Sequence, residues 1–210
     1  MPLAAILYAI VIIFLILSGI MAHDHFTWTL EVSWVIIGLG ILAWMKTRGK
    51  SITWILGTGL FIHALVLIYG GWYTYEKVPL GFWLSDLFNF ERNHYDRIGH
   101  FIQGFVPAIL CREVLVKNDV VASRKWRELI VFAFIMAFTG IFELLEFGAA
   151  QAFGQGADAF LGSQGDVWDA QRDMLMCGIG GILSIVLLAK WHERQLRNQS
   201  SPTDTQGEHE

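Results

Sequence analysis

Apolar stretches long enough to cross a membrane recur along the whole chain, with short polar or aromatic segments between them. A helix of about 20 apolar residues crosses the hydrocarbon core of a bilayer, which is about 30 Å thick. The sequence therefore predicts an all-α fold, a polytopic membrane helical bundle with about six transmembrane helices. The predicted spans are 3–22, 27–45, 51–71, 98–116, 129–150 and 173–191.

The predicted spans belong to one domain. Residues 3–22 carry no charge and no Lys or Arg precedes them, whereas a signal peptide begins with basic residues and ends in small residues. We therefore expect a retained first helix. Residues 1–195 are predicted to form a single integral membrane helical domain. The polar residues 196–210 are predicted to be a disordered cytoplasmic tail.

One connection stands out by its composition. Residues 72–97 separate the third and fourth predicted spans and are rich in Trp, Tyr and Phe. Aromatic side chains concentrate where the hydrocarbon core of a membrane meets water. We therefore expect this segment to lie on the membrane interface or to dip into it, in place of forming a free linker.

Basic residues gather on one side of the predicted membrane. The connections 46–50 and 112–128 and the flank 190–197 hold eleven of the 15 Lys and Arg residues. Because such loops stay on the cytoplasmic side, both termini are predicted to be cytoplasmic. The net charge of −4 is small and spread over the connections, which predicts no nucleic-acid partner. With 54% hydrophobic and 16% charged residues, the chain is also unlike a disordered or ordinary soluble protein.

Ionisable residues of the last three spans fall at one depth in this arrangement. The fourth span begins outside, the fifth ends there and the sixth begins there, so their polar residues share the outer leaflet. Burying one charged side chain costs about 2.5–3.5 kcal/mol, so these residues are expected to face one another, water or a ligand. They are Asp96, His100, Glu143, Glu146, Asp169 and Asp173. His63 lies at a similar depth, either as a site residue or as a packing histidine bonded to a carbonyl.

Other polar residues have simpler interpretations. The tract His23-Asp24-His25 is either a solvated helix exit or a metal site, and its shortness favours the exit. Glu31 fits the first turn of its helix, where the helix dipole favours a carboxylate. Arg112 and Glu113 are expected to snorkel to the opposite surface. Close packing of the sixth helix on a neighbour is expected at Gly178, Gly180 and Gly181.

Three motifs resemble those of the VanZ-like membrane proteins. That family typically shows D-[KR]-x-x-H-F at a helix start, a later E-[LI]-[LI]-[QE], and D-x-x-x-N before a glycine-rich helix. The matching stretches here are DRIGHF at 96–101, ELLE at 143–146 and DAQRD at 169–173. Asp173 departs from the family asparagine and adds a second carboxylate. This resemblance covers about the last four spans.

The chain is also similar, over essentially its first 195 residues, to the YjdF group of bacterial inner-membrane proteins. The two resemblances imply a location in the bacterial cytoplasmic (inner) membrane. They also imply a link to envelope physiology and glycopeptide susceptibility, without a defined reaction. The positions carried over from the motifs are Asp96, Arg97, His100, Glu143, Glu146, Asp169 and Asp173.

These residues suggest a metal-dependent site as one hypothesis. Several carboxylates and a histidine in a low-dielectric pocket cannot all stay ionised and unpaired, and a divalent metal ion is one solution. A bound ion could activate water or polarise a phosphoryl or carbonyl oxygen of an envelope lipid, glycolipid or polyprenyl carrier. The hypothesis assigns metal binding to His100, Glu143, Asp169 and Asp173, catalysis to His100, Glu143, Glu146 and Asp96, and head-group binding to Arg97 and Arg172.

Two non-enzymatic interpretations stand beside this hypothesis. Arg97 and Arg172 could simply pair with carboxylates at helix starts as a structural polar network. Intramembrane carboxylates and histidines also relay protons in transporters, although the spans show no inverted repeat and no broken helix pair. A pocket open only outward would favour a site, and a channel reaching both faces would favour transport. The membrane lipids are the expected partners, and the metal identity and oligomeric state stay open.

Overall fold

The computed structural model describes residues 3–153 and 163–200, and in this part of the chain every regular element is a helix. Six helices are long and apolar enough to span a membrane, which confirms the predicted all-α polytopic bundle. They are α1 (Leu3–Met21), α2 (His25–Thr47), α3 (Trp54–Tyr73), α5 (Tyr95–Lys117), α6 (Arg124–Phe153) and α8 (Asp169–Ser200). Two short helices lie between α3 and α5, namely η1 (Tyr75–Lys77) and α4 (Pro79–Phe88).

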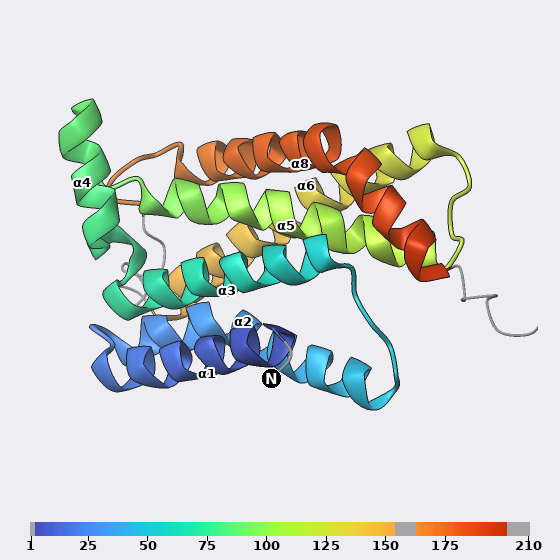
Figure 1. Cartoon of the computed structure of the whole chain (residues 1–210). Coiled ribbons are helices and arrows are strands. Elements are labelled where there is room, and N and C mark those ends of the chain that lie inside the picture. The colour runs from blue at the N-terminus through green and yellow to red at the C-terminus, as the bar shows by residue number, and fades with distance from the viewer. Residues whose placement is uncertain (1–2, 154–162, 201–210) are drawn as a thin grey trace, which may run out of the picture.

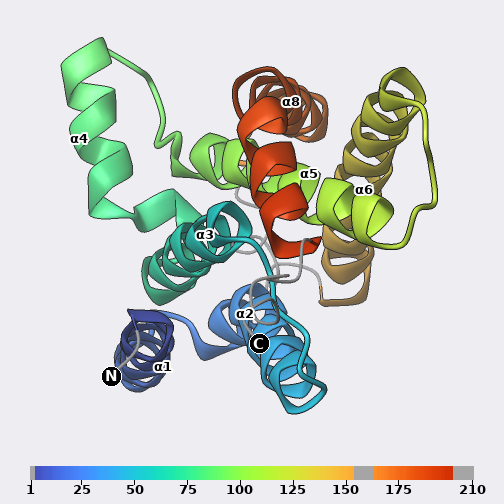
Figure 2. The same ribbon diagram turned by 45° about the vertical axis from the view of Figure 1, so that its right-hand side comes forward.

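The long helices run side by side, and α5 lies at the centre between α3, α6 and α8 (Figures 1 and 2). In the spanning segment of α5, 56% of the residues are buried within the protein, against 11% in α1. The helix with the lowest hydropathy of the six is thus the one that the others cover, as a helix carrying ionisable residues requires.

Helices α5 and α8 approach each other backbone to backbone. A Cβ atom added at Gly104 of α5 would lie 1.8 Å from the carbonyl oxygen of Cys177 of α8. A Cβ atom at Gly180 of α8 would lie 2.1 Å from the carbonyl oxygen of Phe101 of α5. The expectation of close packing at the glycines of the sixth span is confirmed, and Gly104 is the partner that the sequence analysis did not identify. Small residues at both helices permit this approach.

Helix α4 lies at one end of the bundle and runs across the direction of the long helices (Figures 1 and 2). Pro79 occupies its first turn, and Asn89 ends it in the left-handed conformation. Gly81 and Ser85 face the protein, where the Ser85 hydroxyl donates to the carbonyl oxygen of Arg92 at 2.6 Å. The rest of the helix exposes Leu80, Phe82, Trp83, Leu87 and Phe88. The exposed apolar face of α4 fits the interfacial placement predicted for residues 72–97, which stays a prediction, whereas Tyr75, Val78 and Tyr95 are buried in the protein.

The C-terminal end of the last helix differs from the prediction. Helix α8 continues to Ser200, whereas the polar tail was predicted to begin at residue 196. The buried side chain of Leu196, which is 3% exposed, explains why the helix does not end at the last apolar span residue. Residues 201–210 lie outside the described part of the chain, so the predicted disorder there stays a prediction.

The side of the membrane that each end faces also stays a prediction. The starts of α2, α5 and α8 and the ends of α3 and α6 lie at the end of the bundle where α4 lies (Figure 1). We call this the outer end, following the distribution of basic residues. The opposite end, with the Lys- and Arg-rich connections, is called the inner end.

The contact between α5 and α8 yields the first prediction. Gly104→Ala is expected to lower the free energy of unfolding by about 1–3 kcal/mol, because its methyl group overlaps the Cys177 backbone. Gly148→Ala on α6 is the matched control, since no atom of the described residues outside its own helix backbone lies within 4 Å of its added Cβ. Thermal unfolding in detergent, followed by circular dichroism, compares the two variants. Equal midpoints for Gly104→Ala and the unmodified protein would contradict the packing.

Candidate functional site

The outer half of α5 presents Asp96 and His100 on one face, a single turn apart, as the spacing predicted. The His100 Nε2 atom lies 3.6 Å from Asp96 Oδ1 and 3.7 Å from Glu143 Oε1 of α6. His100 is 3% exposed and Asp96 is 8% exposed. Residues from two separate spans therefore meet at one depth, which was the central expectation of the sequence analysis.

Helix α8 adds Asp173 to this group. Asp96, His100 and Asp173 each offer a ligand atom, and these atoms lie within 4.8 Å of one another. All three residues are buried. In the described part of the chain, they are the three side chains of ligating type placed closely enough to hold one metal ion.

Asp169 has a different role from the one predicted. Its Oδ1 atom is 2.8 Å from Arg97 Nη2 and 3.0 Å from Arg92 Nη2. Two guanidinium groups thus already neutralise and orient this carboxylate. Asp169 and Glu143 were both predicted as metal ligands, and neither belongs to the ligand group. Asp96, predicted as a catalytic residue, does.

The connection before α8 is bound to the start of α5. Arg97 Nη2 and Arg172 Nη1 lie 3.1 Å and 2.5 Å from Asp166 Oδ2. The backbone N–H of Trp168, together with Arg172, holds the pKa of Asp166 below its usual value despite some desolvation. The Gln164 side chain accepts from the Asn93 N–H at 3.1 Å and donates to the Asn93 carbonyl at 2.9 Å. These contacts fix the outer rim above the ligand group.

Several buried polar atoms in the cluster have no hydrogen-bond partner. They are His100 Nδ1, Gln103 Oε1, Glu143 Oε1 and Asp173 Oδ1. Asp173 Oδ1 lies 3.1 Å from Arg97 Nη1, which is an ionic contact without hydrogen-bond geometry. Buried polar groups in proteins are nearly always paired, so four such atoms at one place indicate a ligand, an ion or water.

A cavity of about 60 Å³ adjoins the group. Its lining comes from one face of each of four helices and from η1, and it includes Glu31, His63, Tyr75, His100 and Glu146. One ordered water needs about 10–15 Å³ of such space, so several small groups fit. His63 is therefore at the site, which was one of the two alternatives for it.

Sequence reasoning missed Glu31 and Tyr75. Glu31 was expected at a helix start, but the α2 helix begins at His25, so Glu31 lies further down and is 4% exposed. Burial, followed by the carboxylate of Glu31, raises the pKa of Tyr75 well above its usual value. Tyr75 thus keeps its proton and can donate a hydrogen bond. The pattern of Glu31 and Trp34 on one face of α2 was the available clue.

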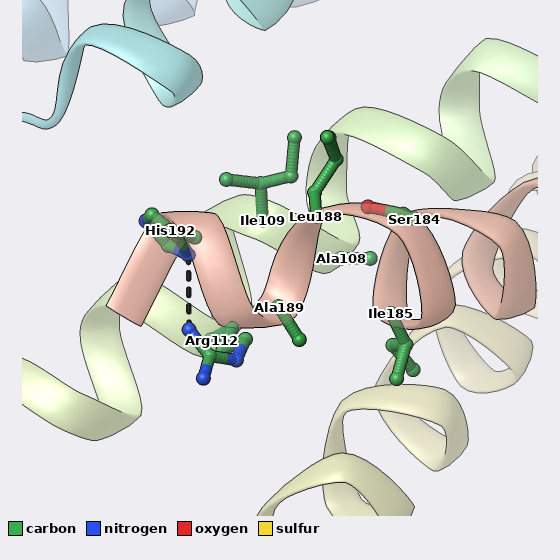
Figure 3. A pocket seen from close by; sticks show the side chains of 8 residues that line it. All are labelled: Ala108, Ile109, Arg112, Ser184, Ile185, Leu188, Ala189 and His192. Carbon is green, nitrogen blue, oxygen red and sulfur yellow. Dashed lines mark hydrogen bonds between the residues drawn. The ribbon is translucent and has the colours of Figure 1, made fainter. Parts of the chain in front are cut away.

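A second ionic cluster lies at the inner end and corrects the snorkelling expectation. Arg112 and Glu113 are buried at 2% and 3% exposure, and neither reaches the surface. Arg112 Nη1 lies 3.2 Å from His192 Nδ1, as Figure 3 shows, and His192 Nε2 lies 3.0 Å from Glu113 Oε2. The adjoining cavity measures about 10 Å³, which is room for one water at most.

The tract at residues 23–25 forms a helix cap. The Asp24 side chain accepts a hydrogen bond from the Thr27 N–H at 2.8 Å and so caps α2. His23 Nε2 lies 3.2 Å from Lys77 Nζ, a donor that turns the ring nitrogen into an acceptor. The tract therefore belongs to the helix start, in agreement with the favoured interpretation.

Six helices of membrane-spanning length around a buried ionisable cluster define the chain as a multi-pass membrane protein. The chain belongs to the family described as predicted membrane protein (DUF2238), whose model matches residues 3–194. It is similar to the inner membrane protein YjdF of Escherichia coli (strain K12), with 46% identity over 183 residues and 87% of each chain covered. No solved structure matches the chain. The resemblance to the YjdF group is thereby confirmed, and the VanZ-like motifs stay a resemblance.

The arginines give the second prediction. Arg97→Ala is expected to lower the free energy of unfolding by about 3–5 kcal/mol, because it leaves the buried carboxylates of Asp169 and Asp173 without their shared partner. Arg172→Ala is the control, since its side chain is 57% exposed and an exposed ion pair contributes about 0–1 kcal/mol. Thermal unfolding of both variants in detergent tests this, and equal losses would contradict the assignment. Adding Asp173→Asn to Arg97→Ala should recover part of the loss, because Asp173 is the carboxylate left without an arginine, whereas Asp169 keeps Arg92.

Proposed function

We propose that the outer cluster binds a divalent metal ion and uses it to act on an anionic envelope lipid or polyprenyl-type substrate. The observation that carries this proposal is the group of Asp96, His100 and Asp173, whose ligand atoms lie within 4.8 Å of one another. Two ligands of one ion lie within about 4.4 Å of each other, twice a bond of about 2.2 Å. A small inward movement of these side chains would complete the site.

The ligand set leaves open positions for chemistry. One histidine with two carboxylates suits zinc or manganese, and three protein ligands leave a place for water, as in catalytic sites. Metal-bound water is deprotonated far more easily than free water. Glu143, whose Oε1 atom is 3.7 Å from His100 Nε2 and has no hydrogen-bond partner, is placed to accept that proton.

The reaction class follows from these roles. The water oxygen would add to phosphorus of a phosphate ester, and the ester P–O bond would break. The proton taken by Glu143 would pass to the departing oxygen, so that the carboxylate is regenerated. Glu146 is buried beside this position on α6 and lines the cavity with Asp96. These roles keep the predicted catalytic residues, with Asp96 added as a metal ligand.

The two arginines predicted to bind the head group divide into different roles. Arg97 is buried and holds Asp169 and Asp173, so it orients a ligand carboxylate. Arg172 has a 57% exposed side chain at the outer rim, where an anionic head group arrives first. We therefore assign head-group binding to Arg172 and a positioning role to Arg97.

The alternatives explain less of the geometry. A structural network accounts for Arg92, Arg97 and Asp169, whose charges are paired. It does not account for the unpartnered atoms of His100 and Glu143. For transport, a route across the membrane is needed, and the outer cavity of about 60 Å³ shares no lining residue with the inner cavity of about 10 Å³.

The third prediction concerns metal binding. Purified protein, stripped by a chelator and titrated with zinc or manganese, is expected to show a saturable rise in thermal stability, worth about 2.7 kcal/mol at 100 times the dissociation constant. His100→Ala and Asp173→Asn should abolish the rise. His25→Ala is the control, because His25 is exposed and lies in the helix cap of α2. If elemental analysis and titration find no bound ion in any form of the protein, the proposal fails.

The lipid part of the proposal needs a cellular measurement. A deletion strain is complemented with the unmodified gene or with Glu143→Gln, and its envelope lipids and glycopeptide sensitivity are compared. Glu143→Gln keeps the shape of the side chain but removes the proton acceptor. It should bind metal normally and fail to restore the lipid profile. If Glu143→Gln restores the lipid profile, Glu143 is not the proton acceptor of the reaction.

A further inference from the structure

The outer cavity has an aromatic wall that a metal site does not need. Trp34 of α2 packs edge-on against Phe138 of α6, with ring centroids 6.1 Å apart, and lies 6.4 Å from Phe142. All three rings line the cavity. Phe138, Phe142 and Glu146 follow one another at four-residue spacing, so a single face of α6 presents two rings and a carboxyl group.

Two carboxyl groups of the cavity remain without a cationic partner. Glu31 and Glu146 are 4% and 8% exposed and come from different helices. No Lys or Arg among residues 3–153 and 163–200 forms an ion pair with either, whereas Arg97 and Arg172 pair with aspartates of the rim and of α8. A metal ion held by Asp96, His100 and Asp173 would leave these two groups uncompensated. Burial of a carboxylate needs a positive partner or a proton.

A third observation points to a ligand in this space. Gln103 lines the cavity and is 7% exposed, and its side chain lies against His100 without a well-aligned hydrogen bond to its Oε1 atom. An amide oxygen accepts hydrogen bonds only, so a donor in the cavity would give it a well-aligned partner. Carboxyl groups, an acceptor oxygen and aromatic faces together are the surroundings that ammonium groups select, through charge, hydrogen bonds and cation–π contacts.

We infer that the outer cavity binds the ammonium group of an amine, carried either by an aminophospholipid head group or by a small free amine. The volume of about 60 Å³ corresponds to about four to six waters, which suits an aminoethyl group and excludes a whole lipid. Trp34 is 39% exposed, so the aromatic wall between α2 and α6 also forms part of the outer surface of the bundle. A lipid can lie against that surface while its head group enters the cavity. This inference goes beyond the proposed reaction and does not require the metal.

The test uses ethylammonium chloride as the probe and the full-length protein in nanodiscs of phosphatidylglycerol. A saturable rise in thermal stability is expected with ethylammonium and not with equal concentrations of sodium chloride or ethanol. Trp34→Leu and Glu31→Gln should each weaken the apparent affinity by about 10-fold. Trp44→Leu is the matched control, because Trp44 lies on the same helix, is 53% exposed and does not line the cavity.

Two further arms separate the sources and the hypotheses. If phosphatidylethanolamine in the nanodiscs weakens the apparent affinity for ethylammonium, the lipid head group is the ligand. If that affinity is unchanged, the ligand is a small free amine. Asp173→Asn should lose the metal response and keep the ethylammonium response, which distinguishes this inference from the proposed metal chemistry. Glu146→Gln replaces Glu31→Gln if the latter fails to fold. No saturable response, or an equal response in Trp34→Leu and the unmodified protein, overturns the inference.

Discussion

Backbone contact between α5 and α8 sets the height at which the outer ionisable residues meet. The two helices run in the same direction, and the positions of Gly104 and Gly180 leave no space for a Cβ atom between them. His100 lies one turn outward from Gly104, and Asp173 lies two turns outward from Gly180. A contact that resists both sliding and separation therefore holds a histidine and a carboxylate opposite each other. Larger side chains at these glycines would push α5 and α8 apart and so separate His100 from Asp173.

The charges of the outer end divide into two zones with different physics. At the rim, Arg92 and Arg97 face Asp169, and each charge has a partner of opposite sign. Deeper in the bundle, Asp96, Glu143 and Glu146 contact a histidine or line a cavity, without an arginine at ion-pair distance in the described chain. Arg97 marks the boundary because it also reaches Asp173. The carboxyl groups that lie deeper than Arg97 create a negative region, which attracts positively charged ligands.

Hydropathy was enough to locate the spans because apolar runs of membrane length have few alternatives in a helical protein. The depth of Asp96, His100, Glu143 and Asp173 followed from helix direction and rise per residue. The sequence did not show which of these carboxylates lack an arginine partner. Asp169 and Asp173 are one turn apart in the sequence, and Arg97 was a possible partner for either. Only the tertiary structure shows that Asp169 has two arginine partners, Arg97 and Arg92, and no motif singles out Arg92. Glu31 was misplaced for a related reason, since its helix begins earlier than the apolar pattern indicated.

Arg112 and Glu113 show where reasoning from one helix fails. A charged pair near a helix end can snorkel only if solvent is there, and the long inner part of α8 brings His192 and Glu193 over them instead. In that inner cluster, Glu113 accepts from the Thr53 hydroxyl at 2.6 Å and from Lys117 at 2.7 Å. Because Arg112 can only donate, His192 Nδ1 accepts and its Nε2–H donates to Glu113.

The inner and outer clusters use the same residue types, so composition cannot assign function to either. Their hydrogen-bond partners and the adjoining cavities distinguish the two clusters. At the inner end, His192 and Glu113 use their polar atoms on protein partners, and the cavity beside them holds one water at most. At the outer end, His100 and Glu143 keep unpartnered buried atoms beside a cavity of about 60 Å³. The inner cluster also leaves Arg127 Nε and Glu128 Oε2 without a hydrogen-bond partner, but only the outer cavity has room for a ligand larger than one water. The outer cluster is thus the better candidate for a ligand site.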